Sequence, residues 1–123
     1  MKRLAAAATA LFACACATSG AKINFVPSSA GATLTARPSP CAVEVHSEKS
    51  PDRPFTALGV INFHHEWHRG LINAPTVDAA LPQIKARACE VGADAVVLHV
   101  TEERRLEFGM LHVAATALRF DGQ

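Results

Sequence analysis

The sequence has 123 residues, half of them apolar, and a formal net charge of +1. This length accommodates one domain and a short appendage, and the near-neutral charge argues against a nucleic-acid partner bound through a basic surface. One tryptophan and no tyrosine leave few rings to stack on bases or sugars, and no apolar stretch is long enough to cross a bilayer as a mature helix.

The N-terminus has the pattern of a bacterial export signal. Met1-Lys2-Arg3 is basic, and the uncharged, alanine-rich stretch from Leu4 to Ala13 has the length of a secretory signal core. Leu11-Phe12-Ala13-Cys14 resembles the lipobox, in which an aliphatic and a small residue precede the cysteine that is lipidated. We therefore predict a lipoprotein signal peptide over residues 1–13 and lipidation of Cys14.

Two alternatives to lipidation at Cys14 stay open, namely lipidation of Cys16 and an ordinary cleaved signal or alanine-rich helix. Several acyl chains on one cysteine would hold the protein firmly, at ~0.8 kcal/mol per buried CH₂. The residue after Cys14 is Ala15 and not an aspartate. In the enterobacterial lipoproteins that this pattern resembles, the lack of an aspartate at this position favours export to the outer membrane. We expect an outer-membrane lipid anchor in the bacterial cell envelope, with the domain facing the periplasm or the cell surface.

Residues 14–40 are predicted to be the lipidated N-terminus and a tether. From Ala17 to Pro40 the chain is rich in small polar residues and prolines, which bury too little area to offset chain entropy and favour extended segments. Two runs, Ile23-Asn24-Phe25-Val26 and Ala32-Thr33-Leu34-Thr35, are β-like and could add an edge strand. The alternative is a disordered or loosely docked spacer.

The folded domain is predicted over residues 41–121. Cys41 to His46 alternates apolar and polar residues, which indicates a half-buried strand. Phe55 to Phe63 is a second strand, with Gly59 as a bulge or a point of close approach. His64 to Thr76 is predicted to be a long connection.

A helix and a glycine turn follow this connection. Thr76 is a candidate N-cap for a helix beginning at Val77, although Pro82 would cost ~3 kcal/mol deep inside a helix. Either the first turn is therefore separate or the regular helix begins near Leu81. Gly92 is suited to end the helix in the left-handed conformation. The helical spacing of four apolar residues predicts its buried face: Leu81, Ile84, Ala88 and Val91.

The chain closes with two further strands. Ala95 to Val100 begins with an apolar run typical of a covered strand, Thr101 to Gly109 is a charged, solvated turn, and Met110 to Phe120 is the hairpin partner. The order β-β-α-β-β predicts a two-layer α+β domain, with about four strands in an antiparallel or mixed sheet and one main helix on one face.

Cys41 and Cys89 fall in the folded domain of a chain predicted to be exported, where disulfides persist. A bond between them would close a loop of about 48 residues and stabilise a small domain by ~4 kcal/mol through the entropy of the unfolded chain. The alternative is two buried thiols that pack as small hydrophobic groups.

The densest group of metal-ligating side chains is His64, His65 and His68 around Glu66. On a helical turn His64 and His68 would share a face and could bind zinc with a third ligand. On an extended chain they would lie about 13 Å apart, too far for one metal. The alternative is a polar loop.

Two other histidines, His99 and His112, are predicted to lie on the final two strands, where they could pair across the hairpin; the alternative is that each is an ordinary surface or hydrogen-bonded histidine. Asp94 is suited to accept backbone hydrogen bonds at the turn between helix and strand. No nucleophile, phosphate-loop or paired-carboxylate motif stands out, so we expect a protein that is not an enzyme and has no cofactor.

Two motifs, Pro54-Phe55-x-x-Leu58-Gly59-x-Ile61 and Gly92-Ala93-Asp94-Ala95-Val96-Val97, resemble a group of small bacterial envelope lipoproteins. The group includes the Rcs-pathway stress-sensor (RcsF-like) lipoproteins, with YbjQ-like domains as more distant relatives. The resemblance covers about Cys41 to Phe120 and implies a shared fold. The stress sensor has two disulfides in its domain, whereas Cys41 and Cys89 allow one here.

The sequence thus favours an outer-membrane lipoprotein with a small non-catalytic binding or stress-sensing domain and an envelope protein as partner. The alternative is a metal-binding module that uses the His64, His65 and His68 loop.

Overall fold

The structure, a computed structural model, describes residues 21–28, 34–68, 75–105 and 108–122. The predicted signal peptide, Cys14 and Cys16 lie outside the described residues. Five strands and one helix follow in the order β1 (Ala21–Pro27), β2 (Glu44–Ser47), β3 (Phe55–His68), α1 (Val77–Glu90), β4 (Ala95–Arg104) and β5 (Phe108–Phe120). In the described part of the chain, no helix has the length and apolar character needed to cross a membrane.

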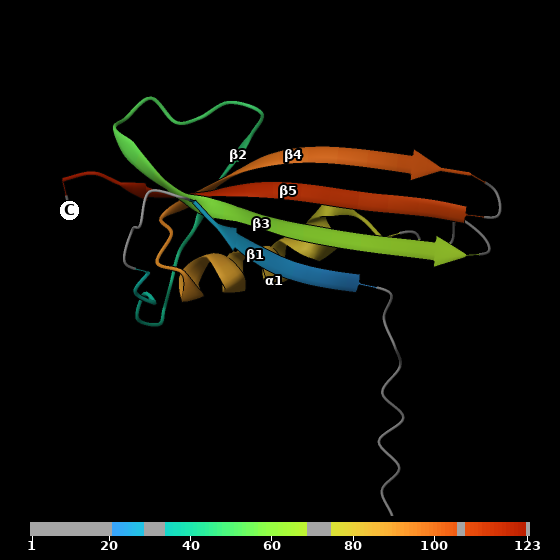
Figure 1. The fold of residues 1–123 in the computed structure, drawn as a ribbon, viewed down its shortest axis with the longest axis horizontal. Helices are drawn as coiled ribbons and strands as arrows, with labels where there is room; N and C mark the ends of the chain where they lie inside the picture. Colours follow the sequence, from blue (N-terminus) through green and yellow to red (C-terminus); the bar gives the residue numbers. More distant parts are fainter. Residues whose placement is uncertain (1–20, 29–33, 69–74, 106–107, 123) are drawn as a thin grey trace, which may run out of the picture.

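The strands form one mixed sheet in the order β1-β3-β5-β4-β2, with α1 packed against one face (Figure 1). All neighbours are antiparallel except β2 and β4, which run parallel. The predicted two-layer α+β class is thereby confirmed. The sheet has a fifth strand because residues 21–27, within the predicted tether, pair with β3 along its outer edge.

The main core lies between α1 and the sheet. Because side chains alternate along a strand, each long strand gives every second residue to this face, and the helix adds Ala80, Ile84 and Ala88. Leu81 is partly buried against the same core and Val91 is buried in it, so the predicted helix face is confirmed. The strand residues fully enclosed in this core include Ile61, Phe63, Val96, Leu98, Leu111, Val113, Ala115 and Ala117.

A smaller core lies at one end of the sheet. It consists of Ala95, Val97, Leu118 and Phe120, with Phe55 packed against them. By strand alternation these residues fall on the face opposite the helix. The rest of that face, which we call the open face, has no helix over it in the described residues (Figure 1).

The helix is one continuous element from Val77 to Glu90 despite Pro82. The Thr76 hydroxyl accepts a hydrogen bond from the Ala79 amide at 3.2 Å, which confirms the predicted N-cap. The proline lies in the second turn, on an exposed position. Burial of the helix's apolar face therefore outweighs the local penalty, as packing commonly does over propensity.

Two glycines take the conformations predicted for them. The β3–β5 register shifts between Ala57 and Gly59, which is the predicted bulge. A side chain at Gly59 would strike the Phe25 ring and the Val26 carbonyl, so β1 approaches β3 closely there. Gly92 has φ +84°, the left-handed conformation expected after α1.

Parts of two predicted connections are strands instead. β3 continues through His64 to His68, and the final hairpin pairs as far as Arg104 and Gly109. The prediction of a long connection beginning at His64 was therefore wrong. By strand alternation His64 and Glu66 fall on the open face, whereas His65 and Trp67 fall on the helix side, and Trp67 joins the main core.

Candidate functional site

The helix C-terminus and the start of β4 are covered by residues 34–43, which we call the strap. Cys41 in the strap and Cys89 in α1 form a disulfide with an S–S distance of 2.06 Å and a Cα–Cα distance of 6.2 Å. The predicted disulfide is thereby confirmed. It joins the strap covalently to the last turn of the helix, and both cysteines are half-buried.

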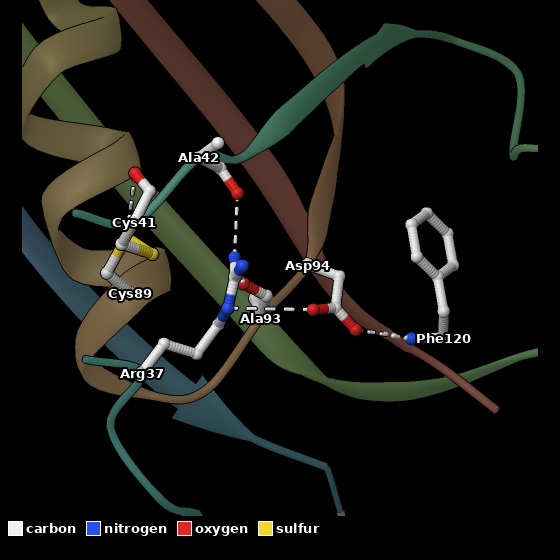
Figure 2. A network of polar contacts seen from close by, with 7 residues as sticks. All are labelled: Arg37, Cys41, Ala42, Cys89, Ala93, Asp94 and Phe120. Atoms are coloured by element: carbon white, nitrogen blue, oxygen red, sulfur yellow. Dashed lines mark hydrogen bonds and ion pairs between the residues drawn. A yellow bond between two sulfur atoms is a disulfide. The ribbon is translucent and has the colours of Figure 1, made fainter. Parts of the chain in front are cut away.

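Arg37 makes the polar attachment of the strap (Figure 2). Its backbone amide donates to the Cys89 carbonyl at 2.9 Å. Its Nη1 donates to the carbonyl of Ala42 at 2.7 Å and to that of Ala93 at 3.0 Å. The guanidinium therefore ties two points of the backbone together, beside the disulfide.

Asp94 completes the network from the turn between α1 and β4. One carboxylate oxygen lies 3.6 Å from Arg37 Nε, and the other accepts a hydrogen bond from the Phe120 amide at 2.8 Å. Asp94 was predicted to accept backbone hydrogen bonds in its turn, and the donor is the end of β5. The Asp94 side chain is only 11% exposed, so this charge is held by partners with little help from water.

Two hollows flank this network. One of about 450 Å³ lies between the strap and the end of β5, and the other, of about 300 Å³, lies toward the start of β2. The Arg53 guanidinium sits 3.7 Å from the centre of the Phe120 ring at the second hollow, within the range of a cation–π contact. Both hollows are lined by Arg37, Asp94 and Phe120.

This arrangement suits recognition of a polar surface. Arg37 and Asp94 already have partners, so their charges are fixed in place and their geometry is set before any partner arrives. The Phe120 ring is only 5% exposed, so the groups that the hollows offer to a partner are mainly polar. Sequence reasoning predicted Asp94 and the disulfide but missed Arg37, because no local pattern links Arg37 to Asp94 across the fold. The position of Arg37 among prolines in the predicted tether concealed it further.

The predicted histidine group is not brought together on one side of the sheet. His64 and His65 are consecutive residues of β3 and point to opposite faces. His65 lies edge-on to Phe63, with ring centroids 6.4 Å apart. The side chain of His68, the third residue of the predicted group, lies outside the described part of the structure. Across the described ranges, no group of three or more His, Cys, Asp or Glu side chains is arranged to hold a metal ion.

His64 meets a different histidine. It pairs with His112 of β5 in the sheet register, and the two ring centroids are 6.1 Å apart. His99 pairs with Ala114, and His112 pairs with Thr101, so the pairing of His99 with His112 that the sequence allowed is not formed. The hairpin register offsets those two histidines by two residues, and this offset could not be read from the sequence.

Comparison with known proteins identifies no relative. No family model matches the chain, and neither the curated proteins nor the solved structures contain a match.

Proposed function

We propose that the chain is an outer-membrane lipoprotein whose α+β domain is a non-catalytic binding or stress-sensing module of the bacterial envelope. The anchor is a lipid on Cys14, and the partner is another envelope protein. The resemblance of the two fold motifs to the RcsF-like lipoproteins supports the same proposal.

The observation that carries this proposal is the Cys41–Cys89 disulfide. Structural disulfides persist in oxidising compartments such as the periplasm and are rare in the cytosol of mesophiles. The N-terminal sequence predicts export to such a compartment, because a basic start and an alanine-rich apolar stretch precede the lipobox-like Leu11-Phe12-Ala13-Cys14. The N-terminal sequence and the disulfide favour the same location.

The strap network is the surface we assign to the partner. Its two hollows present Arg37 and Asp94 in fixed positions beside the Phe120 ring. The covalent and polar attachments of the strap hold that surface in shape while the N-terminal anchor holds the domain near the membrane. A partner with exposed polar groups fits this surface.

Lipidation can be tested by metabolic labelling with an alkyne fatty acid in a bacterial host, followed by membrane fractionation. We expect label and outer-membrane localisation in the unaltered protein and in Cys16→Ala, and loss of both in Cys14→Ala. Cys16→Ala is the matched control because it removes a neighbouring cysteine. Label that persists in Cys14→Ala would assign the anchor to another residue, and absence of label in the unaltered protein would overturn the proposal.

A further inference from the structure

The open face of the sheet carries a pair of imidazoles on adjacent strands. His64 in β3 and His112 in β5 are directly opposed in the antiparallel register, and their ring centroids are 6.1 Å apart. Opposed residues have Cβ atoms about 4.5–5.5 Å apart, which lets both side chains reach one point above the sheet. Both residues are half-exposed, so an ion has access from solvent.

A carboxylate lies beside one member of this pair. Glu66 is two residues after His64 on the same strand face, and its Oε1 lies 3.1 Å from His64 Nε2. When Nε2–H donates to this carboxylate, Nδ1 carries the lone pair that a metal needs. A metal-bound histidine commonly donates its other ring nitrogen to a carboxylate, which sets the tautomer and raises the basicity of the ligand.

The surroundings tolerate a cation. Lys22 of β1 is the cation paired with His64 in the register, but its side chain is exposed and its ammonium can extend into water. Glu66 adds negative charge on the same face. On the other side, the cross-strand partner of His112 is Thr101 of β4, which is uncharged.

We propose that His64 and His112 together bind a divalent transition-metal ion, with Glu66 positioning the His64 ring. Imidazole ligands suit zinc and copper, and Zn–N bonds of about 2.0–2.1 Å require the two rings to move closer together than the 6.1 Å between their centroids found here. Water completes the coordination sphere. This site differs from the His64, His65 and His68 set predicted from sequence, and it does not depend on the proposed envelope function.

The test is Zn²⁺ titration by isothermal calorimetry, with imidazole resonances followed by NMR. All variants are made in a Cys14→Ser/Cys16→Ser background under oxidising conditions, because free thiolates also bind zinc. The reference and His65→Ala should each take up one equivalent of Zn²⁺. His64→Ala and His112→Ala should lose this uptake, and Glu66→Gln should weaken it about 10- to 100-fold.

The matched control is His65→Ala, which removes the neighbouring imidazole on the opposite face of β3. Unchanged uptake in His112→Ala, loss of uptake in His65→Ala, or no saturable binding in the reference would each overturn the proposal. Both pair members are half-exposed, so the alanine variants should fold, and circular dichroism verifies this. If either is unfolded, His64→Gln and His112→Gln carry the same prediction with a polar side chain retained.

Discussion

Removal of the Cys41–Cys89 disulfide should remove a large part of the stability of this domain. The bond joins residues 48 positions apart. A loop of this length reduces the entropy of the unfolded chain enough to contribute about 4 kcal/mol. The total free energy of unfolding of a domain is commonly 5–15 kcal/mol, so the double variant Cys41→Ser/Cys89→Ser should fold only marginally. The midpoint of thermal unfolding should fall by roughly 15–30 °C for a domain of about 100 residues.

The assay is urea unfolding followed by tryptophan fluorescence, with Cys16→Ser as the control that removes a cysteine outside the disulfide. The unaltered protein in reductant should unfold like the double variant, because both lack the cross-link. A free energy of unfolding in the double variant within about 1 kcal/mol of the control would refute the reasoning, since the cross-link would then contribute far less than the entropy model requires.

Three further predictions concern stability and use the same unfolding assay. Gly92→Ala should lower the free energy of unfolding by about 2–4 kcal/mol, because its φ of +84° is left-handed and a side chain would strike the strap backbone. The control Gly122→Ala has a similar φ of +83° but open space around it, so it should lose only about 1–2 kcal/mol. Equal losses in the two variants would contradict the close approach of the strap to Gly92. Gly109→Ala should cost about 1–3 kcal/mol and shift the emission of the single tryptophan, because the new methyl group would meet the Trp67 ring; unchanged emission would show that the ring does not cover this glycine. Asp94→Ala should lower the free energy of unfolding by about 2–3 kcal/mol, and Asp94→Asn by about 1 kcal/mol. The asparagine side chain keeps an oxygen that accepts from the Phe120 backbone N–H but loses the charge. An equal loss in both variants would show that the hydrogen bond itself contributes nothing.

The parts of the fold that the sequence predicted are those set by local chemistry. Thr76 caps the helix, Gly59 marks the bulge and Gly92 turns left-handed because each residue type satisfies a constraint within a few positions. The Cys41–Cys89 pair was predicted from compartment and position, and the fold brings the two residues together. Each of these inferences needed no knowledge of which strand lies beside which.

The parts that the sequence did not predict depend on long-range pairing. His64 to His68 forms a strand because β5 lies alongside it, although the polar composition resembles a loop. Ile23 to Val26 was predicted only as one of two runs that could add an edge strand, and the choice depends on β3, with which Ala21–Pro27 pairs. Arg37 lies next to Asp94 only in the folded chain, where α1 places the turn before β4 beside the strap. The His64–His112 pair likewise follows from the β3–β5 register, which no local pattern specifies.

We propose a lipid-anchored envelope protein whose domain is cross-linked by one disulfide. The most direct test is the intact mass of the protein purified from its native membrane, measured with and without reduction and alkylation. We predict an N-terminal triacylated Cys14 and two thiols, those of Cys41 and Cys89, that become alkylatable only after reduction. An unlipidated chain, or alkylation of Cys41 and Cys89 without reductant, would contradict this account.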